Sequence, residues 1–336
     1  MKKSLARKYN EISAATDAAF PDKLGNLVIL LLPSRGTPVY VSPKIADKLS
    51  KDVADVKRVV LSLGKQMITD GWAGVTYPYY RLAGVDVGLI AMRKEQSGFY
   101  GPGNTKEMWS LFVLDHELGH RLLRNGSYLR AKSRQHAESA ADAYAMLRHI
   151  QRFGKGTKFA ESRGSRLASR VVLYNDIAHY SKFTLDRVLE VSQDIDIARL
   201  TPLTMAALAS KIADETLLDA ELRTKLSKAY RPVYDACRKY IGGPKTLGPK
   251  FLERDPETYD LFCRETLAVM RAHSDDPDIL DVGRNFLISF PSIIEFMQKG
   301  AKTDPYWKEA LDFLGNPAPQ PSRRNPLGFM KKIFTH

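Results

Sequence analysis

The pattern of hydrophobic positions is mixed in the first hundred residues. Apolar and β-branched runs at 25–33 and 37–43 are bounded by Gly, Pro and Ser and separated by a short polar turn, which predicts a β-hairpin. Between Pro43 and about Asp70, apolar residues recur every three or four positions, as in an amphipathic helix with at most one interruption. Segment 73–93 again has the composition of one or two strands.

From Asn104 onward the periodicity is almost wholly helical. Asn104 is a suitable N-cap with Glu107 three residues later, and the apolar run that follows continues to a favourable stop at Asn125. A second helix is expected from about Ser133 to Gly154. Further helical segments are expected at about 165–175, 183–192, 202–240, 256–273, 279–299 and 304–314.

These elements predict an α+β fold, with a small mixed or antiparallel sheet packed on a long helix, followed by a mainly helical C-terminal region. A chain of 336 residues is expected to contain about two domains. We expect residues 1–155 to form the first domain and 156–316 to form a helical second wall of a cleft or a partner-binding module. Residues 317–336 are rich in proline and basic residues and are expected to form a flexible tail.

The composition is 44% hydrophobic, 26% charged and 10% aromatic, which excludes wholesale disorder and collagen-like repeats. The two cysteines, Cys237 and Cys263, lie outside any CxxC pattern, so neither a disulfide scaffold nor a cysteine-rich metal site is expected. The apolar run at 27–32 is far shorter than the roughly 20 residues that cross a bilayer. The first twenty residues lack the apolar core of a Sec signal peptide. We therefore expect a soluble protein without a transmembrane segment, either cytoplasmic or exported without a Sec signal.

The residues at 116–120 read His-Glu-Leu-Gly-His, the HExxH pattern of zincins. On a helix, His116 and His120 lie one turn apart on the same face, so both imidazoles can reach one metal ion while Glu117 lies beside it. Zinc would polarise a water molecule and the substrate carbonyl, and Glu117 would take the proton and later pass it to the leaving amine.

A catalytic zinc site also needs a third protein ligand and an open position for water. The extended pattern HExxHxxGxxH is absent, because position 123 is Leu and position 126 is Gly, and this excludes the metzincin arrangement. Eighteen positions after His120 comes Glu138, with Asp142 one helical turn further on. Glu138 is the expected third ligand, and Asp142 is expected to accept a hydrogen bond from the free ring N–H of a zinc-bound histidine.

The combination of HELGH with a downstream ExxAD resembles the gluzincins, the metallopeptidases that include thermolysin-like enzymes and the CAAX prenyl proteases. The resemblance covers about residues 104–150, and the short link between the motifs is nearer to thermolysin-like or ImmA-like antirepressor peptidases. It implies a zincin active-site helix in the first domain and one Zn²⁺ per chain, with Glu117 as catalytic base and Asp142 as orienting carboxylate. The implied zinc ligands are His116, His120 and Glu138. The chain lacks the membrane spans of prenyl proteases, so their substrates are not implied.

These residues also have structural interpretations. The two histidines could be core residues, and Glu138 with Asp142 could form a solvated helix face. His136 is a rival third ligand, although it lies two residues from Glu138 and so points to a different side of the helix.

A zincin needs a further donor to the oxyanion of its tetrahedral intermediate. By residue type, His179 and Tyr180 are the best candidates, in a stretch between two helices that could equally be an exposed turn. Tyr128 and His149 are weaker candidates. In zincins an edge strand beside the active-site helix binds substrate as an added strand, and we expect segment 84–93 to have this role.

The pattern therefore predicts a soluble zinc-dependent endopeptidase acting on a protein or peptide substrate. The alternative is a non-catalytic helical module with a degenerate or structural metal site, which would bind nucleic acid or an acidic protein through its net charge of +13. No nucleic-acid motif is present, so an acidic partner is favoured over nucleic acid. A third hypothesis is metal-dependent hydrolysis of a non-peptide amide. Glu117 favours catalysis, because a purely structural zinc does not need a base beside its ligands.

Overall fold

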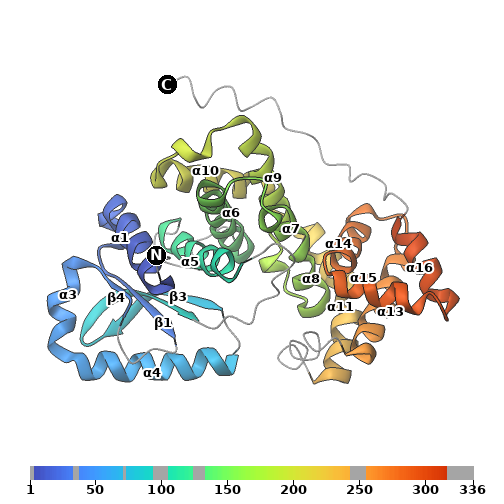
Figure 1. Ribbon diagram of the computed structural model, residues 1–336, viewed down its shortest axis with the longest axis horizontal. Coiled ribbons are helices and arrows are strands. Elements are labelled where there is room, and N and C mark those ends of the chain that lie inside the picture. Colours follow the sequence, from blue (N-terminus) through green and yellow to red (C-terminus); the bar gives the residue numbers. More distant parts are fainter. Residues whose placement is uncertain are drawn as a thin grey trace.

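The computed structural model describes residues 4–32, 38–70 (backbone only at 68–70), 73–93, 105–123, 133–242 and 255–315. It has the α+β architecture expected from the sequence. A mixed four-stranded sheet near the N-terminus packs on helices, and a mainly helical region follows (Figure 1). The predicted tail at 317–336 lies outside the described residues.

The strand order in the sheet is β2-β1-β4-β3. The strands are β1 (Leu27–Leu32), β2 (Tyr40–Val41), β3 (Gly74–Leu82) and β4 (Val85–Arg93). β1 pairs antiparallel with β2, which confirms the predicted hairpin, and β3 pairs antiparallel with β4 through a turn in which Ala83 and Gly84 have φ of 47° and 74°.

The prediction that segment 84–93 is the edge strand beside the motif helix is wrong. β4 pairs with β3 on one side and, in parallel, with β1 on the other, so segment 84–93 is central. Among the described strands β3 lies at the edge and packs against the motif helix. The parallel pairing joins segments about sixty residues apart, for example Leu27 with Gly88. Local hydrophobic patterns carry no information on such a pairing, because it depends on how the intervening helices cross over the sheet.

Both faces of the sheet are covered, and β1 is buried at all its positions for that reason. Its odd-numbered residues pack into one hydrophobic cluster and its even-numbered residues into another. The even face is covered by α3 (Pro43–Leu49) and α4 (Val53–Asp70). The short 3₁₀ turn η1 (Ser50–Asp52) joins them, which confirms a helical stretch with one interruption. The odd face is covered by α1 (Leu5–Ala19), α2 (Pro21–Leu24) and α5 (Lys106–Leu122).

The helix α5 carries the HExxH motif and packs along α6 (Arg134–Phe153). The hydroxyl of Thr105 caps α5 by accepting the Met108 N–H at 3.1 Å, whereas the expected cap at Asn104 and the expected stop at Asn125 lie outside the described residues. Ser133 caps α6, which ends before Gly154 as predicted.

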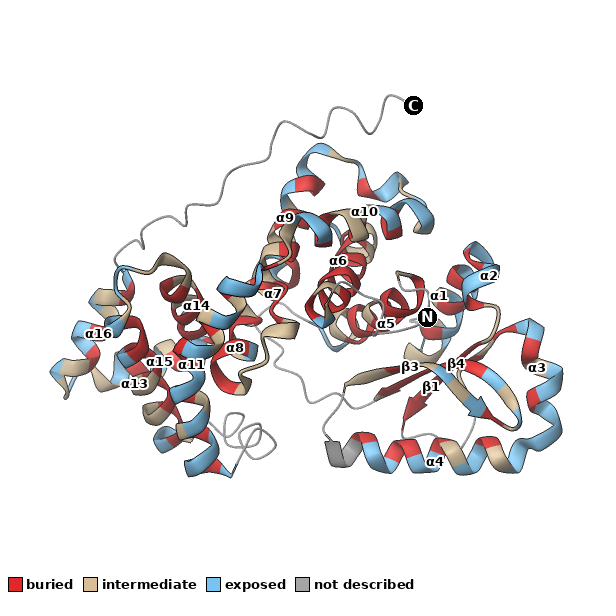
Figure 2. Cartoon of the chain, turned by 180° about the vertical axis from the view of Figure 1, so that it is seen from behind, coloured by how far each residue is buried: buried red, intermediate tan, exposed pale blue. Residues whose placement is uncertain are grey.

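The two helices approach closely at the glycine of the motif. A Cβ placed on Gly119 would lie 2.9 Å from the Cα of Ala141, so a larger residue at position 119 would push the helices apart. Most of α6 is buried, as Figure 2 shows, because α5 lies on one side and later helices on the other.

The remaining described elements are helical. They are α7 (Lys158–Arg166), α8 (Ala168–Tyr174), η2 (Ile177–His179), α9 (Lys182–Asp194), η3 (Ile197–Arg199), α10 (Pro202–Thr216), α11 (Ala220–Ile241), α13 (Pro256–Ala272), α14 (Pro277–Ile288), α15 (Pro291–Gly300) and α16 (Pro305–Gly315). The expected helix 202–240 is two helices, because Asp219 caps a new start, and 279–299 is divided before Pro291.

One hydrophobic cluster contains residues from Tyr9 to Leu314, on both sides of the boundary expected at residue 155. The division into two domains stays a prediction. Among the described helices, none combines the length and apolar character that a membrane crossing requires.

Candidate metal centre

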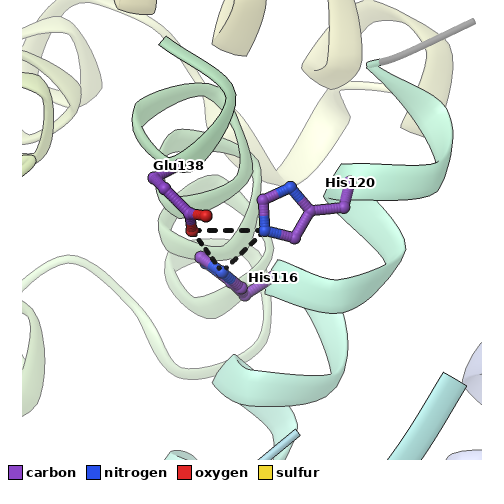
Figure 3. A group of neighbouring side chains, drawn as sticks. All are labelled: His116, His120 and Glu138. Atoms are coloured by element: carbon purple, nitrogen blue, oxygen red, sulfur yellow. Dashed lines mark hydrogen bonds and ion pairs between the residues drawn. The ribbon is translucent and has the colours of Figure 1, made fainter. Parts of the chain in front are cut away.

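Two helices bring three potential metal ligands together. His116 and His120 project from successive turns of α5 toward Glu138 in the first turns of α6, as Figure 3 shows. The Nε2 atoms of the two histidines lie 3.1 Å apart, and each lies 3.3 Å from Oε2 of Glu138. All three ligand atoms lie within 4.8 Å of one another, so the group could hold a metal ion.

Asp142 orients the ring of His116 by a hydrogen bond to Nδ1, the nitrogen that faces away from the other two ligand atoms. Its Oδ1 accepts a hydrogen bond from His116 Nδ1 at 2.8 Å, and its Oδ2 accepts one from the Ser181 hydroxyl. Because an ionised carboxylate can only accept, Nδ1 carries the hydrogen and Nε2 faces the other two ligand atoms. The sequence predicted this contact from the one-turn spacing between Glu138 and Asp142.

The electrostatics of the group fit a bound cation. Burial opposes charge on His116, but Asp142 and Glu138 raise the pKa of this imidazole from 6.5 to about 10. Burial likewise opposes ionisation of Asp142, yet His116 holds its pKa down at about 2. Burial also opposes ionisation of Glu138, but the charge of His120 and the contacts with both histidines hold its pKa well below the ordinary value. The two carboxylates beside His116 thus favour a positive charge between the donor atoms, as a bound metal ion would supply.

Glu117 follows His116 on α5 but is not part of the group that could hold a metal. Its Oε2 accepts a hydrogen bond from the hydroxyl of Thr76 at 2.6 Å, and its side chain is buried against β3. A Cβ on Gly74 would lie 2.9 Å from Oε1 of Glu117, so a larger residue at position 74 would displace this carboxylate from its present place. The strand β3 thus fixes the Glu117 side chain.

His179 reaches the group from η2. Its Nε2 lies 3.4 Å from Oε2 of Glu138, and its Nδ1 is 2.6 Å from Oδ2 of Asp176. Burial opposes ionisation of Asp176, but the hydrogen bond and charge of His179 lower its pKa. Tyr180 is completely buried and packs edge-on against Phe183 at a centroid distance of 5.8 Å. Of this pair, His179 is the residue that the structure brings to the metal group.

The rival residues are placed elsewhere. His136 lies on a different side of α6, where its Nε2 is 3.1 Å from Oδ1 of Asp214. His149 stacks on Phe159 in the core, and burial lowers its pKa to about 4. Tyr128 lies outside the described residues.

Sequence analysis did not identify four residues that shape the site, namely Gly74, Thr76, Asp176 and Ser181. Asp176 could have been found, because an aspartate three residues before His179 falls within reach of the ring in a single helical turn. The other three have no local signal, since they lie 39 to 43 positions from the side chains they contact.

The comparisons with known proteins give no relative for this chain. No protein-family model matches it, and no curated protein or solved structure does so. What the site can do therefore follows from its own residues and their geometry.

Proposed function

We propose that this protein is a zinc-dependent endopeptidase of the gluzincin type, with His116, His120 and Glu138 as metal ligands. Two imidazole nitrogens and one carboxylate oxygen are the ligand set of thermolysin-type catalytic zinc, which leaves a coordination position open. A zinc ion held there would polarise a water molecule and the carbonyl of the scissile bond. The near contact of the three ligand atoms supports this choice.

The position of Glu117 carries the proposal. This carboxylate follows the ligand His116 in sequence, yet it is held by Thr76 and takes no part in the metal group. A carboxylate that follows a ligand histidine on the same helix, is held in place and does not serve as a ligand suits the role of general base. Glu117 would accept a proton from the attacking water and deliver it to the leaving amine. A structural metal site would not need such a residue.

His179 would provide the second donor to the developing oxyanion. Asp176 holds its Nδ1 and so fixes the ring, while Nε2 lies beside Glu138. With Nδ1–H donated to Asp176, a second hydrogen on Nε2 gives the ring a positive charge, and in this form Nε2–H would donate to a substrate oxygen bound at the metal group, as oxyanion stabilisation needs.

The proposed substrate is a protein or peptide in an extended conformation. β3 is the last strand of the described sheet, and Thr76 on this strand contacts Glu117. A peptide that added to β3 as a further strand would pass beside the proposed base.

A hydrolysis assay with metal exchange tests the proposal. The purified chain is stripped with a chelator, reloaded with zinc, and incubated with casein and with a peptide library, and products are identified by mass spectrometry. We expect cleavage only after reloading and none with Glu117→Gln. One zinc per chain without peptide cleavage would instead favour the non-catalytic module, and cleavage of small amides alone would favour the third hypothesis.

A further inference from the structure

Outside the metal group, the buried side chain of Arg121 has a positive charge that no described carboxylate balances. Arg121 follows the ligand His120, but its side chain is directed toward the sheet, and only 8% of its surface is exposed. Its guanidinium donates to the carbonyl oxygens of Pro78 (2.7 Å) and Lys23 (3.3 Å) and to Oδ1 of Asn26 (3.1 Å). No described carboxylate forms an ion pair with it, and its Nε has no acceptor among the described residues.

The Arg121 guanidinium packs against the backbone of β4 at a glycine. A Cβ on Gly88 would lie 2.4 Å from the Cζ of Arg121, so the guanidinium packs against the backbone of β4 at residue 88 and would have to shift if this residue carried a side chain. Burying a cation without an opposite charge is costly, and such groups are normally paired. The arrangement is therefore what a site for an anion would need.

Arg121 lines a cavity of about 440 Å³ between α2, α3 and β3. Three further cations line it, namely Lys23, Lys44 and Lys48, against one carboxylate, that of Asp22. Lys44 and Lys48 lie one turn apart on α3 and form no ion pair with any described residue. None of the metal-group residues lines the cavity, so the two features are separate.

We propose that this cavity binds a small phosphate-bearing molecule. Four cations against one carboxylate fit a ligand with two or more negative charges better than a single carboxylate, and a guanidinium with ammonium groups around it is a usual phosphate-binding set. The volume falls in the range of small-molecule sites rather than of a protein interface. Tyr79 also lines the cavity and is 74% exposed, so its ring is available to stack on a base or sugar.

Calorimetric titration of the full chain with inorganic pyrophosphate tests the proposal. The matched variants are Lys44→Gln/Lys48→Gln in the cavity and Lys57→Gln/Lys65→Gln on exposed positions of α4, which remove equal charge. These lysines are on the surface, so both proteins should fold. We expect binding of one pyrophosphate per chain, weakened about tenfold or more by the cavity variant, because hydrogen bonds to charged groups are lost, and unchanged by the α4 variant.

Equal losses in both variants would show only general attraction to a basic protein, and would overturn the proposal. So would the absence of pyrophosphate binding, an unaffected cavity variant, or binding of citrate in preference to every phosphate compound. Adenosine diphosphate distinguishes the source of the phosphate. If adenosine diphosphate binds more tightly than pyrophosphate and Tyr79→Ala removes this difference, the ligand is a nucleotide. If the two compounds bind with equal affinity, the cavity recognises the phosphate group alone. Neither result depends on peptidase activity.

Discussion

His116 donates the hydrogen of its Nδ1 to Oδ1 of Asp142 at 2.8 Å, and this bond decides which nitrogen of the ring faces the metal group. The same carboxylate accepts from Ser181 through its other oxygen, so its orientation is fixed from two sides. The imidazole is thereby held with Nε2 toward Glu138 before any metal binds. Preorganisation of this kind reduces the ordering that metal binding would otherwise require.

Replacement of the proposed base should abolish hydrolysis without emptying the site. We expect Glu117→Gln to lower turnover at least ~100-fold, because general base catalysis contributes about that much, while bound zinc stays at the wild-type level. Turnover is measured on a cleaved peptide and zinc by elemental analysis. The control is Glu221→Gln on the exposed start of α11, which should behave as wild type. Full activity of Glu117→Gln would refute the assignment.

Removal of a ligand should empty the site. We expect His116→Ala, His120→Ala and Glu138→Ala to lose zinc after dialysis, because two remaining ligands are too few for catalytic zinc. His136→Ala is the matched control on the same helix, since that ring contacts Asp214 instead. An empty site in His136→Ala together with a filled site in Glu138→Ala would reverse the choice of third ligand.

Loss of the orienting carboxylate should weaken the site without destroying it. Asp142→Asn keeps the size of the side chain but removes its charge, and we expect zinc affinity or activity to fall by ~10- to 100-fold. Competition with a chromophoric chelator measures the affinity. Ser181→Ala removes only one hydrogen bond to the same carboxylate and should have a smaller effect. The assignment fails if the asparagine variant binds zinc as tightly as wild type.

The metal-free protein should lose stability as pH rises. The pKa of His116 is raised from 6.5 to about 10 in the folded chain, in spite of its burial, by Asp142 and Glu138. The stabilisation of the fold by the protonated His116 ring is therefore fully present below pH 6.5 and is lost as pH rises through about 10. We expect the free energy of unfolding, measured with urea, to fall across this range. His116→Asn should remove most of this fall, and an equally steep fall in that variant would contradict the prediction.

The number of protons released when zinc binds is a second test of the protonation of His116. Because its carboxylate neighbours raise the pKa of His116 to about 10, we expect this ring to be protonated at pH 8 in the metal-free chain. A ligand nitrogen must be deprotonated, so zinc binding should release about one proton from it. Calorimetry in two buffers of different ionisation enthalpy counts the protons released. Zinc binding without proton release would show that His116 is neutral before the metal arrives.

Loss of the proposed oxyanion donor should affect turnover more than binding. We expect His179→Phe to lower kcat by ~100- to 1000-fold with little change in KM. Asp176→Asn should lower kcat less, since the ring keeps its place but loses its charged partner. Tyr180→Phe, at a fully buried position, is the matched variant. A normal kcat in His179→Phe, or a larger loss in Tyr180→Phe, would remove His179 from this role.

The sequence by itself determined the class of fold, most helix and strand positions, and the core of the candidate site. The strands, the capped α6 and the helical C-terminal region follow from local periodicity and from capping residues such as Ser133, which act within a few positions. The metal group was predictable for the same reason. His116 and His120 are related by one turn of a single helix, and Glu138 and Asp142 by one turn of the next, so each pair is fixed by local geometry.

Only the tertiary structure decided which strand lies beside α5, what holds Glu117, and where the charge of Arg121 is placed. Thr76 reaches Glu117 from 41 positions away, and Gly88 accommodates Arg121 from another strand. These contacts depend on the order of strands in the sheet and on how closely the helices pack on it. Side-chain periodicity says which residues face the interior, but it does not say which buried residue lies opposite which, because that is set by long-range packing of the whole chain.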